Sequence, residues 1–352
     1  MSTRSAIGPQ VSVDSIEFVV ADPKLRGVAL LHELRRPRRV EFAPQSGTWR
    51  LSLPRPAAAR LEYLLELTFR DGRRALGPDP GNPLRAPGPF GDKSVVEFPG
   101  YEPPGWVADQ DAAQGTVREL PLESVRLRTT LPALLWSAAD TDPDRPLPLL
   151  LVHDGPEYGE YSSLVRLLDH LVDFGEVPEL RALLLPPAGD RNESYSASAR
   201  YANALAADLV PAALRHAPTD RPPVLLGASL GALAALHAHF RNPGLLGGLF
   251  LQSGSFFRRR FDSHELGFSR FARIARFVGQ VHGRRGFAPA IPTTVTCGTA
   301  EENLDNNRAL VEALQRRGWD VRTFWQRDAH NWTAWRDALH PHLAELILRA
   351  WT

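Results

Sequence analysis

The segment Gly227-Ala228-Ser229-Leu230-Gly231 could present a serine hydroxyl for nucleophilic attack. A serine hydroxyl is a weak nucleophile unless the backbone exposes it beside a base. The G-x-S-x-G pattern does this on a strained turn between a strand and a helix, where small flanking residues relieve crowding. An apolar run over 224–226 precedes the pattern and helix-forming residues follow it. We therefore expect Ser229 to be a nucleophile and the N–H of Leu230 to face a developing oxyanion. The alternative is a structural glycine-rich turn.

A histidine after a late strand could serve as the general base. In sites of this kind the partners follow the serine in the order acid, then histidine. His330 comes directly after an apolar strand predicted over 319–325, which would bring its imidazole to the sheet edge that carries the serine. Five of the other histidines after the serine lie in a loop or in a predicted helix, where surface or core-edge roles are expected: His237, His239, His282, His340 and His342.

A carboxylate must orient that imidazole and stabilise its protonated form. A strand predicted over 291–297 ends in the loop 299–303, which contains two glutamates. Glu301 is the first candidate and Glu302 the second, while Asp328 ranks third because it lies too near His330 in sequence. The alternative for either glutamate is a carboxylate that favours the first turn of the following helix.

The elements that must position these residues alternate along the second part of the chain. A pair of antiparallel strands is predicted at 117–138. Strands then follow over 148–152, 180–185, 224–226, 246–252, 291–297 and 319–325, and helices over 162–174, 197–214, 230–240, 304–317 and 333–350. This alternation predicts an α/β fold with a doubly wound, mostly parallel sheet and helices on both faces.

The first hundred residues have a different pattern. Runs such as 11–20 and 61–69, read as rich in β-branched and aromatic residues, are separated by turn signals, which predicts a small β-sandwich over 1–105. An irregular stretch with prolines and glycines follows, so we expect a linker over 106–114 and a catalytic domain over 115–352.

Composition limits the classes of partner. The 352 residues carry a formal net charge of +1, and arginines are scattered among comparable numbers of acidic residues, so no nucleic-acid partner is expected. The triplet 258–260 is interpreted as a solvated loop.

The single cysteine, Cys297, cannot form an intrachain disulfide or a cysteine metal site, and we expect neither a metal nor a cofactor. No run approaches about 18 apolar residues and no signal-peptide core is evident, so we expect a soluble cytoplasmic protein without a membrane partner. The oligomeric state is left open, with a homodimer as one option.

Seven stretches follow one another in the order typical of a known family. They are 151–155 (Leu-Val-His-Asp-Gly), 191–195 (Arg-Asn-Glu-Ser-Tyr), 227–231, 251–255 (Leu-Gln-Ser-Gly-Ser), 297–304, 307–310 and 330–336. With these stretches the chain resembles the enterochelin esterase (Fes-like) and esterase D family of α/β-hydrolases. Through 79–83 and 47–49, the first hundred residues resemble the immunoglobulin-like early-set module that precedes several such esterases, a relative of glycogen-binding modules.

The resemblance implies acyl transfer through an acyl-enzyme. Family members hydrolyse esters of siderophores, hydroxycinnamates and S-formylglutathione, and mycolyl transferases are relatives. It also implies an acid at Glu301 or its neighbour. We therefore expect a serine esterase that acts on a small-molecule ester, with siderophore or other polar or aromatic esters as the first candidates.

One residue departs from the family pattern. Relatives often take the second oxyanion donor from the backbone just after the Asp-Gly of the early strand, where this chain has Pro156, which lacks an N–H. Gly155 is then the expected donor, with Glu157 or an incomplete hole as alternatives; losing one donor typically costs about 100- to 1000-fold in rate. The residues expected to line the cleft are Asp154, Tyr158, Arg191, Glu193, Tyr195 and Trp332. Ion pairing is the structural alternative for Arg191 and Glu193, and packing of the histidine loop is the alternative for Trp332.

Two other functions are compatible with these residues. An acyltransferase would use the same triad with an alcohol in place of water. A vestigial hydrolase could instead serve as a glycan-binding protein, with Trp49 and Tyr63 as stacking aromatics or, alternatively, as core residues. For the first domain we also expect a role in shaping substrate access.

Overall fold

The computed structural model describes residues 8–109, 111–283 and 288–351. Residues 1–7, 110, 284–287 and 352, which fall in the predicted domains and linker, lie outside the described residues. The chain forms two compact units. The first unit joins 1–102 to two short later segments, 298–302 and 326–334, and the second comprises 103–297, 303–325 and 335–352. The two short segments are the loops that carry the predicted acid and base.

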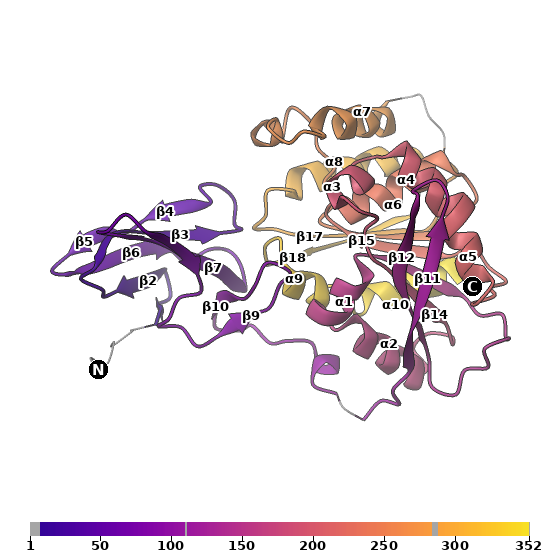
Figure 1. Cartoon of the computed structure of the whole chain (residues 1–352), viewed down its shortest axis with the longest axis horizontal. Coiled ribbons are helices and arrows are strands. Elements are labelled where there is room, and N and C mark those ends of the chain that lie inside the picture. The colour runs from indigo at the N-terminus through magenta and orange to yellow at the C-terminus, as the bar shows by residue number, and fades with distance from the viewer. Residues whose placement is uncertain (1–7, 110, 284–287, 352) are drawn as a thin grey trace. The chain divides into compact units, whose positions relative to one another are not determined.

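The first unit contains two sheets (Figure 1). The four-stranded sheet has the order β1 (Gln10–Val11), β2 (Ser15–Val20), β6 (Thr48–Pro54) and β5 (Ala43–Gln45). The other sheet has the order β4 (Arg39–Glu41), β3 (Leu25–His32), β7 (Arg60–Phe69), β10 (Lys93–Glu97) and β9 (Arg85–Ala86), and β8 (Arg74–Gly77) pairs with β7. Ile16 and Phe18 of the first sheet share one buried core with Tyr63 and Leu65 of the second. Their spacing of two residues is that of strands with one face turned inward.

The second unit is built on an eight-stranded mixed sheet. Its order is β11 (Thr116–Ser124), β12 (Thr129–Ser137), β14 (Arg181–Leu185), β13 (Leu149–His153), β15 (Val224–Ala228), β16 (Gly248–Gln252), β17 (Thr293–Gly298) and β18 (Val321–Gln326). β11 and β12 pair antiparallel, as predicted, and the pairs from β14 to β17 are parallel. The apolar runs of β13, β14 and β15 are buried throughout, which is typical of strands covered on both faces.

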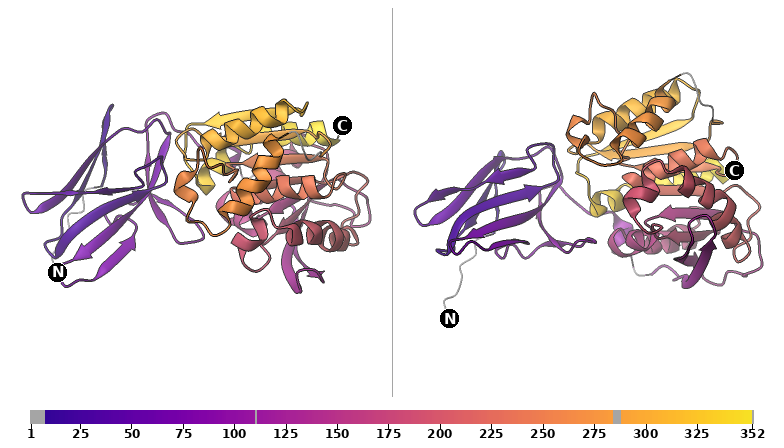
Figure 2. Two further views of the ribbon diagram at one scale, coloured as in Figure 1. Left: turned by 90° about the horizontal axis from the view of Figure 1, so that it is seen from above. Right: turned by 45° about the horizontal axis from the view of Figure 1, so that its top comes forward.

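Helices cover both faces of this sheet. They are α1 (Gly155–Tyr161), α2 (Leu164–Asp173), α3 (Arg191–Tyr195), α4 (Ala199–Ala204), a π-helical turn (Leu205–Leu209), α5 (Val210–Leu214), α6 (Leu230–Arg241), α7 (Phe271–His282), α8 (Leu304–Gln315), α9 (Trp332–Asp337) and α10 (His342–Trp351). Figure 1 shows α4, α6 and α8 on one side of the strands and α1, α2 and α10 on the other, and Figure 2 shows the chain from two further directions. The second unit therefore has the predicted α/β architecture.

Four helical regions differ from the prediction. The sequence predicts no helix over α1, α3 or α7. α1 begins at Gly155-Pro156, and proline is tolerated in a first helical turn because the N–H it lacks would have no helical partner there. The single helix predicted over 333–350 is wrong, because the chain forms α9 and α10 instead. Pro341 lies between them, and it both lacks an N–H and disfavours a helical conformation at His340.

Candidate active site

Ser229 occupies a strained turn between β15 and α6. Its backbone has φ 55° and ψ −121°, a conformation that costs a non-glycine residue energy and persists only where the surroundings enforce it. Its N–H donates to the carbonyl of Gln252 at 2.9 Å, and its carbonyl accepts from the N–H of Ser255 at 3.1 Å. A Cβ on Gly227 would lie 2.6 Å from the carbonyl carbon of Gly231, so only glycine fits there. This is the backbone geometry that the G-x-S-x-G pattern predicts.

The Ser229 hydroxyl has a neighbour that the sequence does not indicate. Oγ of Ser229 lies 3.2 Å from Oγ of Ser255, in the loop after β16. That loop is fixed by the buried Asn307 of α8, whose Oδ1 accepts from the N–H of Gly254 at 3.0 Å and whose Nδ2 donates to the Gly254 carbonyl at 2.8 Å. The stretches 251–255 and 307–310 carried the family resemblance, but no sequence pattern assigned Ser255 a contact with Ser229.

His330 and Glu301 form a close pair within the first unit. Nδ1 of His330 lies 2.6 Å from Oε2 of Glu301, and Oε1 of Glu301 accepts from the N–H of Gly298 at 2.7 Å. Glu301 is fully buried, whereas the His330 side chain is 29% exposed. Because a carboxylate can only accept, Nδ1 of His330 carries the proton of this hydrogen bond.

The other two candidate carboxylates have different partners. Glu302 forms ion pairs with Arg36, at 3.2 Å, and with Arg38. Asp328 accepts through Oδ1 from the N–H of Ala329 at 2.7 Å and from Nδ2 of Asn331 at 3.1 Å. Of the two glutamates that the sequence leaves as alternatives, the structure therefore pairs Glu301 with the imidazole.

Each of these residues follows a strand of the same sheet. Ser229 follows β15, the Glu301 loop follows β17 and the His330 loop follows β18. β18 runs parallel to β17, because the N–H of Thr293 donates to Asp320 and that of Thr299 donates to Gln326 with the same offset. The carboxyl ends of parallel strands meet at the same edge, where α/β proteins carry their ligand sites.

The turn after β13 touches the first turn of α6. Nδ1 of the buried His153 lies 2.9 Å from the carbonyl of Gly231, and a Cβ on Gly231 would lie 3.2 Å from Oδ2 of Asp154. Burial lowers the pKa of His153 to about 4, so its imidazole is neutral and donates through Nδ1. Gly155 is also obligatory, since a Cβ there would lie 2.3 Å from Cα of Leu184. The two predicted oxyanion donors, Leu230 and Gly155, thus belong to segments in direct contact.

The predicted cleft residues separate into two groups. Asp154 and Arg191 form a bidentate ion pair, with Nε–Oδ1 and Nη2–Oδ2 distances of 2.8 and 2.7 Å. Glu193 pairs with two arginines of the α7 region, Arg270 and Arg273, each at 2.5 Å. Arg191 and Glu193 therefore form ion pairs, which is the structural alternative that the sequence left open for both residues.

The two tyrosines are core residues. Tyr158 and Tyr195 are each 0% exposed. The Tyr158 hydroxyl donates to Oε1 of Gln252 at 2.7 Å, and Tyr195 packs against the His153 ring at 4.8 Å. The structure does not place these two tyrosines on a cleft surface, because a fully buried side chain offers no surface to a substrate. They support neighbouring residues instead. Trp332 is half-buried at the start of α9, two residues after His330.

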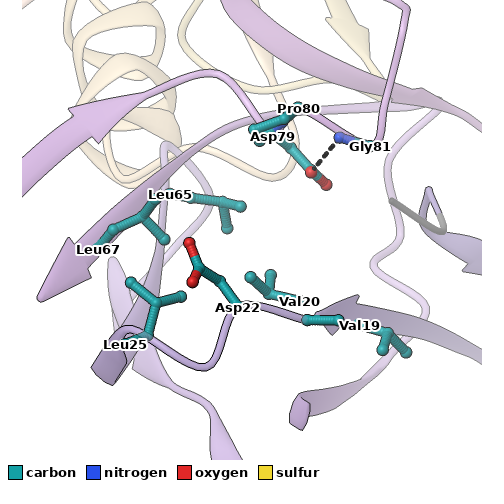
Figure 3. Close-up of a pocket in the computed structure, with 10 residues that line it drawn as sticks. Val19, Val20, Asp22, Leu25, Leu65, Leu67, Asp79, Pro80 and Gly81 are labelled. Carbon is teal, nitrogen blue, oxygen red and sulfur yellow. Dashed lines mark hydrogen bonds between the residues drawn. The ribbon is translucent and has the colours of Figure 1, made fainter. Parts of the chain in front are cut away.

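The first unit contains a small pocket of about 60 Å³, lined mainly by apolar side chains of β2, β3 and β7. Figure 3 shows the Asp22 carboxylate among Leu25, Leu65 and Leu67. None of the predicted site residues lines it. Tyr63, proposed above as a stacking aromatic, is 1% exposed, and its hydroxyl donates to Oδ2 of Asp79 at 2.8 Å. The stretch 79–83 is therefore a turn that fixes a core tyrosine.

Among the described residues, no helix combines the length and the apolar character needed to cross a bilayer.

Several known proteins resemble this chain. The Iron(III) enterobactin esterase of Escherichia coli O6:H1 is 24% identical, covering 92% of this chain and 85% of the relative. The ferric enterobactin esterase structure from Salmonella typhimurium superposes with a TM-score of 0.77 at 20% identity, covering 96% of each chain. The enterobactin esterase structure from Shigella flexneri, determined in the presence of enterobactin, gives 0.74 at 21% identity, covering 96% of this chain and 95% of the other. These structures share the α/β-hydrolase fold. The model of the Esterase family matches residues 125–346, and the chain therefore belongs to this family of carboxylic ester hydrolases.

Proposed function

We propose that the chain hydrolyses esters through an acyl-enzyme, with Ser229 as nucleophile, His330 as general base and Glu301 as the orienting acid. The observation that carries the proposal is the 2.6 Å contact between Nδ1 of His330 and Oε2 of Glu301. It fixes the tautomer in which Nε2 accepts a proton. The positive φ of Ser229 and the common sheet edge support the assignment of the nucleophile.

The proposed reaction has two balanced halves. In the first, Nε2 of His330 takes the hydroxyl proton while Oγ of Ser229 attacks the ester carbonyl carbon. The tetrahedral intermediate collapses, and the departing alcohol takes that proton from His330. In the second half, water attacks the acyl-enzyme and gives a proton to His330. The carboxylic acid leaves, and the proton returns to Oγ of Ser229.

The N–H groups of Leu230 and Gly155 are the proposed oxyanion donors. The contact of the 153–155 turn with Gly231 supports this pair, because it holds the two segments at a fixed spacing. Backbone donors held in this way stabilise negative charge without reorganising during the reaction. Pro156 then needs no N–H, since the donor lies one residue earlier.

The proposed substrates are polar or aromatic esters, with catechol siderophore esters first. The relatives named as enterobactin esterases support this class. Trp332, half-buried and two residues from His330, is the aromatic side chain best placed in sequence to contact an aryl group. The Asp154–Arg191 pair, whose arginine side chain is 36% exposed, is the proposed polar wall.

A panel of esters tests this proposal. Purified protein is assayed with p-nitrophenyl esters of increasing acyl length, a feruloyl ester and a catechol siderophore ester. Ser229→Ala and His330→Ala are expected to lose hydrolysis of every ester that the wild type cleaves. Hydrolysis that persists in Ser229→Ala would remove the assignment of the nucleophile. Product analysis with added glycerol separates hydrolysis from acyl transfer, since a transferase would form the glycerol ester.

A further inference from the structure

A buried arginine of the first unit lies among groups that the proposed reaction does not use. Arg60, the first residue of β7, has a side chain that is 4% exposed. Its Nη1 lies 3.3 Å from Oε1 of Glu62 and 3.8 Å from Oδ2 of Asp328, and its guanidinium lies 5.4 Å from the centre of the Tyr101 ring. A buried cation is stable only where such partners compensate the loss of water.

Asp328 connects this arginine to the histidine loop. While Oδ2 faces Arg60, Oδ1 accepts from the N–H of Ala329 and from the side chain of Asn331. These are the two residues on either side of His330. Asn331 in turn accepts through Oδ1 from the N–H of Ala334 at 2.8 Å, which fixes the start of α9. The position of the imidazole therefore depends on a carboxylate that is itself held by Arg60.

Main-chain hydrogen bonds also join the segment that contains Arg60 to the loop that contains Asp328. The N–H of Ala59 donates to the carbonyl of Arg327 at 2.5 Å, and the carbonyl of Ala59 accepts from Phe98 at 3.0 Å. On the acid side, the N–H of Arg35 donates to the carbonyl of Ala300 at 2.9 Å. The loops of both the acid and the base are thus bonded to residues of the sandwich within one compact unit.

We propose that Arg60 is a positioning residue for the general base: through Asp328 it holds the 327–331 loop so that His330 can transfer the proton. This inference rests on the proposed function, since it assumes that His330 is the base. Arg60 acts without touching the substrate. A displacement of about 1 Å in such a group can cost about 100-fold in rate.

The test is a double-mutant cycle of Arg60→Met and Asp328→Asn, with Arg60→Lys as the variant that keeps the charge. Rates are expressed per active site, counted by the p-nitrophenol burst, so that unfolded protein does not lower kcat. We expect each single variant to lower kcat about 10- to 100-fold with KM changed less than about threefold. Because both act through one contact, the double variant should be no worse than the worse single variant. Arg60→Lys should recover part of kcat.

The matched control is Arg50→Met, an exposed arginine of β6 in the same unit, which should keep wild-type kcat. Wild-type kcat per titrated site in Arg60→Met, or losses that multiply in the double variant, would overturn the inference. If Arg60→Met yields no folded protein, Arg60→Lys and Asp328→Asn still decide, since unchanged kcat in both would overturn it as well. A wild type whose activity does not depend on Ser229 would instead contradict the proposed function.

Discussion

Glu301 binds with both oxygens: Oε2 lies 2.6 Å from Nδ1 of His330, and Oε1 accepts from the N–H of Gly298 at 2.7 Å. The second bond fixes the carboxylate, so the imidazole meets an acceptor in one orientation. A Cβ on Gly298 would lie 2.3 Å from the carbonyl oxygen of Asp328, so the loops that carry Glu301 and His330 are in direct contact. This arrangement favours one tautomer of the imidazole, as a general base would require.

Glu301→Gln should lower kcat by about 1,000- to 10,000-fold, because an amide favours the wrong histidine tautomer. Glu302→Gln provides the comparison, since its carboxylate binds Arg36 and Arg38, and it should keep at least about a tenth of kcat. Steady-state rates with one p-nitrophenyl ester decide between the two residues. The reverse order of effects would make Glu302 the acid.

Ser255→Ala should lower kcat about 2- to 10-fold. The variant removes the hydroxyl that lies 3.2 Å from Oγ of Ser229, and a hydrogen bond of this kind contributes about 0.5–1.5 kcal/mol. The rate of fluorophosphonate labelling should fall by the same factor, because both reactions use the same oxygen. Unchanged rates in both assays would show that Ser255 does not orient the nucleophile.

Gly231→Ala and Gly279→Ala compare two helical glycines. A Cβ at Gly231 would press on Asp154 and His153 at 3.2 and 3.3 Å, whereas nothing lies within 4 Å of a Cβ at Gly279 in α7. We expect Gly279→Ala to raise the free energy of unfolding by about 0.5–1 kcal/mol without changing kcat. Gly231→Ala should lower kcat at least about tenfold, because the oxyanion donors move apart. Urea unfolding and ester assays measure both effects; wild-type kcat in Gly231→Ala would contradict this spacing.

Glu62 should make stability depend on pH. Burial raises its pKa to about 7 from 4.5, against the opposing charges of Arg60 and Lys93. The folded chain thus keeps a proton that the unfolded chain releases, so the free energy of unfolding falls as pH rises from about 4.5 to about 7. Glu62→Gln lacks this titration. Relative to the wild type it should gain up to about 3 kcal/mol between pH 5 and pH 8, measured by urea unfolding at both values. An equal difference at the two pH values would contradict the raised pKa.

The sequence predicts the parts of the site that depend on local pattern. Ser229 stands out as a candidate nucleophile because strand, glycines and helix stand in one continuous segment, and His330 stands out as a candidate base because it follows the last strand. The sequence cannot show which of Glu301 and Glu302 contacts the imidazole, because the two are neighbours in the chain. Glu302 instead forms ion pairs with Arg36 and Arg38, which lie far away in sequence. The sequence is equally unable to show whether an aromatic side chain is buried. An aromatic residue near a motif can line a cleft or, like Tyr195, lie in the core.

In the fold, too, features set by local sequence are predictable and features set by distant contacts are not. The alternating apolar runs predict the strands to within a few residues, because their pattern follows from burial on both faces. The break between α9 and α10 depends on Pro341. The residues on either side have a helical pattern, so the break can be predicted only from the N–H that proline lacks. The links from Arg60 and Ala59 to the His330 loop join residues more than 250 positions apart, so no local pattern records them.

In the proposed mechanism, Ser229 forms the covalent acyl-enzyme with the help of His330. The most direct measurement is mass spectrometry of the intact protein and its peptides after reaction with a fluorophosphonate. We predict one adduct per chain on the peptide that contains Ser229, no adduct in Ser229→Ala, and labelling slowed at least about 1,000-fold in His330→Ala. An adduct on another residue, or wild-type labelling of Ser229→Ala, would contradict it.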